Sequence, residues 1–238
     1  MKEKPKYKRI LLKLSGEILG DKDYVFSEKS LSILVNEIVE VYRMGVDIGI
    51  VIGGGNIIRG SKLVDQLHLD KVTADYTGML STVINGMVLQ SMIEKKGVST
   101  RMMTAIEIKQ IAEPYIRRKA LSHLDKRRIV IFTGGTGNPF FTTDTAAVLR
   151  ASEIGCEVLL KGTKVDGVFD LDPVKNRNAK MFKNINYSSV LIKELNVMDM
   201  TAISLSKENK LPIIVFNILK YGNLIKIVKG EKIGTLVS

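Results

Sequence analysis

The sequence predicts an α/β fold in which helices cover both faces of a mostly parallel sheet. Strand-like apolar runs alternate with segments of helical periodicity along the 238 residues, as in chains built from β-α-β units. Several of the predicted strands also end at glycine-containing loops, at the edge where open parallel sheets bind ligands. Because no linker, repeat or low-complexity tract interrupts the chain, we expect a single domain with two lobes over residues 1–238.

The first half of the chain contains three predicted strands and three predicted helices. Residues 10–14 form an apolar run of strand length. Apolar residues then recur at helical spacing between Leu31 and Tyr42, and Gly45 is expected to end that helix. The next elements are a strand over residues 46–52, a long helix over 73–94, a strand over 99–103 and a helix over 115–124.

The same alternation continues in the second half. A strand over residues 129–132 precedes a helix that begins after Asp144. A strand over 157–161, a helix over 200–208 and a strand over 212–216 follow. Residues 225–228 and 233–237 are apolar runs separated by Gly230, a pattern that predicts a closing β-hairpin.

The composition excludes several classes of protein. No apolar run approaches the roughly 20 residues that span a bilayer, and the basic N-terminus is not typical of a signal peptide. Cys156 is the only cysteine, which excludes an internal disulfide and a thiolate metal site and indicates a reducing compartment. We therefore expect a cytoplasmic protein. Because the chain has only two histidines, His68 and His123, we expect no metal bound directly by protein side chains.

The net charge of +11 attracts anions in general. Basic residues cluster within residues 2–13 and 117–128, but no aromatic residues are interleaved with them in a pattern that would stack bases. Charge runs usually form a solvated face. The sequence therefore predicts no nucleic-acid-binding module.

Three glycine-containing loops are expected to meet at one edge of the sheet. They are the segments KLSG at residues 13–16, GGGN at 53–56 and GGTGN at 134–138, and each follows a predicted strand. Backbone N–H groups that converge from several loops can bind a polyphosphate. None of the three matches a P-loop, a dinucleotide-binding fingerprint or a protein kinase signature, so a phosphate site here is of another kind.

The third loop continues into the segment TGNPFFTTD at residues 136–144. Its glycine and hydroxyl residues precede a predicted helix, a position that attracts phosphate. Phe140 and Phe141 can form a wall for a flat ring. The alternative interpretation is a tight turn in which both phenylalanines fill the core.

Charged residues near these loops are candidates for catalysis. Lys13 lies among apolar residues of a strand, which is costly unless it reaches a partner; alternatively, it extends to solvent. Arg59 can bind phosphate with two hydrogen bonds or belong to a surface loop. Asp144 can orient lysines or bind metal, and it also suits a helix N-terminus.

A fourth segment, residues 161–173, follows the strand predicted at 157–161. Lys161 and Lys164 can neutralise phosphates, and Phe169 can pack on a purine. The pair Asp166-Gly167 by itself predicts only a turn.

Taken together, these segments resemble a known family. The motifs KLSGE at residues 13–17, VIGGGN at 51–56, ADYTGML at 74–80, GTGNPFFTTD at 135–144 and KVDGVF at 164–169 occur in this order. They are similar to those of the bacterial UMP kinases (uridylate kinases) within the amino acid kinase family, and the resemblance covers nearly the whole chain from about residue 8. It implies a three-layer αβα sandwich and transfer of the γ-phosphoryl group of ATP to UMP, with Mg²⁺, in de novo pyrimidine nucleotide biosynthesis. It also implies a homohexamer and feedback inhibition by UTP.

The resemblance assigns site residues by position. The N-terminal lobe is expected to bind mainly UMP and the C-terminal lobe mainly ATP. UMP is assigned to Gly54, Asp75, Thr136, Gly137, Asn138, Pro139, Phe140, Phe141, Thr142 and Thr143. ATP is assigned to Lys13, Leu14, Ser15, Gly16, Gly55, Arg59, Thr163, Phe169 and Asp172, and the charge of Lys161 adds that residue. In catalysis, Lys13 and Arg59 are expected to stabilise the transferred phosphoryl group and Asp144 to hold the cations in place, while Mg²⁺ bridges the ATP phosphates.

One region departs from the family, and two other functions are considered. Many members have a glycine-rich insert, associated with GTP activation, where residues 20–27 here are short and nearly glycine-free; GTP activation is therefore not predicted. An acyl-phosphate-forming relative, such as acetylglutamate or carbamate kinase, is disfavoured by Phe140, Phe141 and Asp75. A nucleotide-sensing or nucleic-acid-binding regulator is suggested only by the positive charge.

Overall fold

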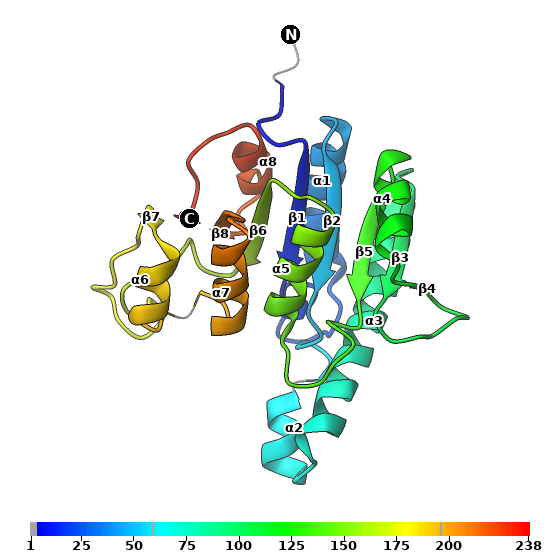
Figure 1. Cartoon of the computed structure of the whole chain (residues 1–238), viewed down its shortest axis with the longest axis horizontal. Coiled ribbons are helices and arrows are strands. Elements are labelled where there is room, and N and C mark those ends of the chain that lie inside the picture. Colours follow the sequence, from blue (N-terminus) through cyan, green and yellow to red (C-terminus); the bar gives the residue numbers. More distant parts are fainter. Residues whose placement is uncertain (1–3, 59, 196) are drawn as a thin grey trace.

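The computed structural model describes residues 4–58, 60–195 and 197–238. Figure 1 shows a twisted sheet with helices packed on both sides. Its nine strands have the order β4-β3-β5-β2-β1-β6-β8-β9-β7. The strands are β1 (Arg9–Leu14), β2 (Asp47–Ile52), β3 (Thr100–Thr104), β4 (Glu113–Pro114), β5 (Ile129–Thr133), β6 (Val158–Thr163), β7 (Asn184–Ile185), β8 (Ile213–Asn217) and β9 (Thr235–Val237). Neighbouring strands are parallel except β8 and β9, which are antiparallel.

The helices form two layers because the central strands are apolar on both faces. The helices are α1 (Glu28–Arg43), α2 (Gly60–Leu67), α3 (Lys71–Glu94), α4 (Arg117–Asp125), α5 (Thr143–Glu153), α6 (Tyr187–Ile192), α7 (Met200–Glu208) and α8 (Asn223–Val228), with a 3₁₀ turn η1 at Gly16–Ile18. On β1, Ile10 and Leu12 pack in a cluster with α1, α3 and α8. Leu11 packs on the other face with α4, α5 and α7. This is the expected three-layer αβα sandwich.

The hairpin predicted near the C-terminus is wrong. Residues 225–228 belong to α8, and β9 pairs with β8 rather than with them. Apolar residues at positions 224, 225, 227 and 228 have the spacing that buries one face of a short helix, and all four are buried. Gly222 adopts a left-handed conformation, with φ of 90°, directly before this helix. Helices α2 and α6 and the short strands β4 and β7 had no clear signal in the sequence.

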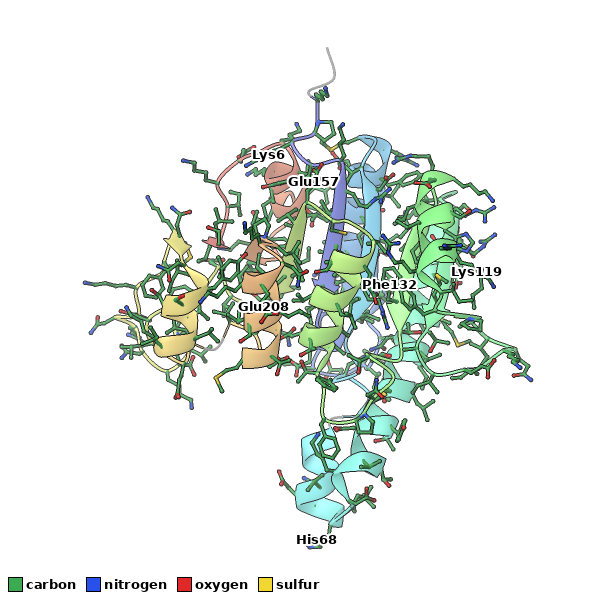
Figure 2. The ribbon with its side chains drawn as sticks, viewed as in Figure 1. Lys6, His68, Lys119, Phe132, Glu157 and Glu208 are labelled. Carbon is green, nitrogen blue, oxygen red and sulfur yellow. The ribbon has the colours of Figure 1, made fainter. Side chains whose placement is uncertain are left out.

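The carboxyl ends of β1, β2, β5 and β6 lie at one edge of the sheet, because these strands are parallel neighbours. Figure 1 shows α2 and the adjoining part of α3 projecting beyond this edge. In Figure 2, His68 lies at the outer tip of that projection, and Phe132 of β5 lies inside the protein. Within the described ranges, no helix has the length and apolar character needed to cross a membrane.

Candidate active site

Two lysines lie side by side at the edge where the strands end. The register of β1 and β6 pairs Lys13 with Lys161, so both side chains leave the same face of the sheet. Asp144, in the first turn of α5, lies between them. The Nζ atom of Lys13 is 2.5 Å from Oδ1 of Asp144, and Nζ of Lys161 is 2.8 Å from Oδ2. The side chains are only 10–14% exposed, so the carboxylate separates two buried like charges.

The environment of this Lys13–Asp144–Lys161 cluster sets its protonation. Burial alone would raise the pKa of Asp144, but the charges of Lys13 and Lys161 outweigh it and hold that pKa below its ordinary value. Burial lowers the pKa of Lys161, and Asp144 opposes this. Lys161 also donates a hydrogen bond of 2.5 Å to the Val197 carbonyl, whereas Lys13 forms a close ion pair with Asp144. Two lysines balanced by one carboxylate leave a site that attracts phosphate.

The first two glycine loops pack tightly against each other beside the cluster. A Cβ atom on Gly16 would lie 2.4 Å from Oδ1 of Asn56 and 2.6 Å from the Gly53 carbonyl oxygen. At Gly54, a Cβ atom would lie 2.7 Å from the carbonyl oxygen of Gly78 in α3. Ser15 immediately precedes η1, which begins at Gly16. Glycine is therefore required at positions 16 and 54 by close approach of the backbones.

A cavity of about 220 Å³ opens between the third glycine loop and α3. Six of the residues assigned to UMP line it, namely Gly54, Asp75, Phe140, Phe141, Thr142 and Thr143. Thr136, Gly137, Asn138 and Pro139 belong to the same loop but lie outside the lining of the cavity.

The conformation of that loop excludes one interpretation of its phenylalanines. Phe140 and Phe141 are 69% and 48% exposed, so they do not fill the core. Phe140 has φ of 69°, a conformation that is uncommon for residues other than glycine. Its N–H donates a hydrogen bond of 2.7 Å to Asp75, and Asp75 is also paired with Lys71 one turn earlier in α3. The ring is thus held at the mouth of the cavity.

A second cavity, of about 230 Å³, lies where β6 and β8 end. Its lining includes Lys164, Phe169 and Lys220. Asp172 is next to this lining and accepts a hydrogen bond of 2.9 Å from the N–H of Val174. Thr163, the last residue of β6, donates to the carbonyl of Val165 at 2.7 Å.

The residues assigned to ATP therefore form two groups. Lys13 and Lys161 belong to the lysine cluster, Leu14, Ser15 and Gly16 follow Lys13 along the chain, and Gly55 lies in the second glycine loop. Phe169 lines the second cavity, and Thr163 and Asp172 lie close to its lining along the chain. Lys164 connects the two, since its ammonium is 3.3 Å from the carboxylate of Glu17 in η1. Arg59 lies outside the described residues.

Sequence reasoning missed Asp199, which holds the beginning of α5. Asp199 precedes α7 and accepts a hydrogen bond from the Ala202 N–H at 2.8 Å. It also accepts hydrogen bonds from the hydroxyls of Thr142 and Thr145. An aspartate before an apolar helical stretch is an N-cap signal that the sequence did contain, but its contact with α5 depends on the tertiary fold.

The described residues contain no group of three or more His, Cys, Asp or Glu side chains placed to hold a metal ion. Asp144, the acidic residue of the cluster, is already paired with two lysines.

Known proteins are similar to this chain over nearly its full length. The model of the amino acid kinase family matches residues 8–217. The chain is 52% identical over 233 residues to the chloroplastic uridylate kinase PUMPKIN of Arabidopsis thaliana, a match that covers 98% of this chain and 69% of that protein. The structure of UMP kinase from Bacillus anthracis matches with a TM-score of 0.94 and 43% identity, covering 98% of this chain and 96% of that one. UMP kinase from Ureaplasma parvum matches with a TM-score of 0.91 and 35% identity, covering 97% and 98%.

Proposed function

The chain belongs to the amino acid kinase family, and we infer that it is a UMP kinase, which transfers the γ-phosphoryl group of ATP to UMP and releases UDP and ADP. The reaction belongs to pyrimidine nucleotide synthesis. The observation that carries this inference is the Lys13–Asp144–Lys161 cluster. Thr143, next to Asp144, lines the first cavity, and Lys164, close to Lys161, lines the second.

The two cavities suggest where the nucleotides bind. We place UMP in the first cavity, mainly in the N-terminal lobe, with Asp75 accepting a ribose hydroxyl. We place the phosphates of ATP along Lys13–Gly16 and Gly55, and the rest of ATP in the C-terminal lobe with its base beside Phe169. Phosphoryl transfer needs little covalent help from the protein, because positioning and charge stabilisation provide most of the rate. Lys13 and Lys161 supply positive charge, and Asp144 keeps both ammonium groups in place.

Mg²⁺ is the proposed metal. It would be carried by the ATP phosphates and would neutralise charge that develops on them. Asp144 pairs directly with both lysines at the strand ends. The roles of Lys13 and Asp144 therefore do not depend on a protein-bound metal.

A coupled assay of ADP release tests the function. We expect turnover with ATP and UMP, and no turnover with carbamate or N-acetylglutamate as the acceptor. Release of ADP with either of those acceptors, and not with UMP, would replace this proposal with that of an acyl-phosphate-forming kinase. UTP, which shares the uridine of UMP, should inhibit competitively with UMP.

We propose that the active form is a homohexamer in which a second copy of this chain covers one face of α3. Tyr76, Leu80, Ile84 and Met87 recur at helical spacing and are 41–46% exposed, which forms an apolar stripe typical of a helix that packs against a partner. Leu80→Glu should reduce the native mass measured by light scattering. An unchanged mass would show that this stripe is not the interface. The single cysteine supports a reducing compartment, and we propose the cytoplasm.

A further inference from the structure

The face of α3 opposite the exposed stripe is buried and includes two polar side chains, Thr82 and Asn85. Thr82 is 2% exposed and Asn85 is fully buried. Burying such groups is costly unless they form hydrogen bonds, so the partners of these two side chains indicate what this face of the helix does. Both bind backbone groups of the glycine loops, and each binds a different loop.

Asn85 holds the second glycine loop. Its Nδ2 donates hydrogen bonds of 2.7 Å to the Gly53 carbonyl and to Oδ1 of Asn56. Asn56 returns a hydrogen bond of 3.1 Å to Oδ1 of Asn85 and another of 3.1 Å to the Val25 carbonyl. Gly16 packs directly on this amide pair, since a Cβ atom there would lie 3.0 Å from Nδ2 of Asn85. Asn85 therefore supports the first and second glycine loops, which carry Gly16 and Gly55 of the ATP assignment and also Gly54 of the UMP assignment.

Thr82 holds the third glycine loop. Its Oγ1 accepts a hydrogen bond of 2.8 Å from the Gly134 N–H and donates one of 2.7 Å to the Met79 carbonyl. Gly134 has φ of 74°, and a Cβ atom there would lie 2.8 Å from Oγ1 of Thr104. This loop continues into Phe140 and Phe141, which line the first cavity. Thr82 therefore supports the loop on the UMP side.

We propose that Thr82 and Asn85 are positioning residues that fix the separation of the two substrate loops. This proposal rests on the proposed function. The two residues are three positions apart on one helix, a rise of about 4.5 Å, so α3 holds both loops at a fixed spacing. In-line transfer depends on that spacing, because a misplacement of about 1 Å can lower the rate about a hundredfold.

Steady-state kinetics of Thr82→Val and Asn85→Ala test this role. Valine keeps the shape of threonine but cannot accept the Gly134 N–H. For Thr82→Val we expect KM for UMP to rise about fivefold or more, with KM for ATP within about twofold of the wild type. For Asn85→Ala we expect KM for ATP to rise about fivefold or more and KM for UMP to rise less, because the second loop carries both Gly55 and Gly54. In both variants kcat should fall about tenfold or more.

Gln90→Ala is the matched control. Gln90 is also an amide in α3, but it bonds the Thr100 carbonyl and not a glycine loop. For this variant, kcat and the KM values for UMP and ATP should stay within about twofold of the wild type. If Asn85→Ala does not fold, Asn56→Ala breaks the same amide pair from the loop side and should give the same split.

Equilibrium titration with UMP and with a non-hydrolysable ATP analogue measures the split without turnover. If the wild type binds both nucleotides but does not phosphorylate UMP, the proposed function fails, while the binding split still decides the role of these residues. The positioning role would be overturned if each substitution changed the affinity for both nucleotides equally. It would also be overturned if KM values stayed unchanged and activity fell only in proportion to the folded fraction.

Discussion

Asp144→Asn removes the only negative charge of the lysine cluster while keeping the size of the side chain. Each ammonium attracts the carboxylate by about 6 kcal/mol at 2.5 and 2.8 Å if the effective dielectric constant is about 20. Desolvation cancels much of this, and removing one partner of a buried pair typically costs about 3–5 kcal/mol. For a chain of this length, we expect a decrease in Tm of about 10 °C.

The pH dependence of the stability lost in Asp144→Asn identifies the cause of that loss. Burial already lowers the pKa of Lys161, and Asp144 raises it, so asparagine should let that pKa fall further. The unfolded state then binds more protons than the folded state between the lowered pKa and the ordinary 10.5, and stability rises with pH across that window. The deficit of Asp144→Asn, measured by urea unfolding, should therefore shrink as the pH rises toward the ordinary lysine pKa of 10.5.

The double variant Asp144→Asn, Lys161→Met is the control. It removes Lys161 together with the carboxylate, so the buried ammonium of Lys13 no longer lies next to a second positive charge. It should recover about half or more of the lost stability without recovering kcat, because the cluster remains incomplete. A deficit for the single variant below about 1 kcal/mol, or one that is independent of pH, would refute the reasoning.

Three further predictions concern the same fold. Lys13→Ala should lower kcat more than about tenfold, equivalent to about 1.4 kcal/mol of barrier; a smaller loss in steady-state turnover would exclude its role at the transferred phosphoryl group. Gly16→Ala should weaken ATP binding and lower stability, because its Cβ atom would lie 2.4 Å from Asn56; calorimetric titration and a melting curve check both. Burial raises the pKa of Glu37 to about 7, although a hydrogen bond from the Gly222 N–H opposes this rise. Between pH 4.5 and 7 the folded state therefore binds more protons than the unfolded state. The free energy of unfolding should fall by about 3 kcal/mol as the pH rises across this range. Glu37→Gln should flatten that dependence in urea titrations, and an unchanged slope would contradict it.

Periodicity predicted most of the central elements, because the buried strands and long helices carry strong local patterns. The bounds of α7 matched at both ends, and β1, β2 and β5 shifted by only a residue. The predictions of short elements failed for a physical reason. The apolar run at 225–228 has too few residues to separate a helix from a strand, and tertiary packing against α1 and β8 decided the outcome.

The sequence could indicate candidate site residues only where they lie close together along the chain. Glycine loops, the hydroxyl-rich segment and the lysines at strand ends are visible as motifs. The hydrogen bonds of Asn85 and Asp199 were not, because their partners are 32 and 54–57 positions away along the chain. Such contacts exist only after the sheet has formed.

The pairing of Lys13 with Lys161 across β1 and β6 also bears on how the chain finds its native state. A shift of one residue between these strands would turn one lysine to the opposite, apolar layer, away from Asp144. An ammonium buried there without a counterion would strongly destabilise the misaligned sheet. The charges that we propose for the reaction thus also discriminate against strand misalignment, so the same three side chains would serve both folding fidelity and catalysis.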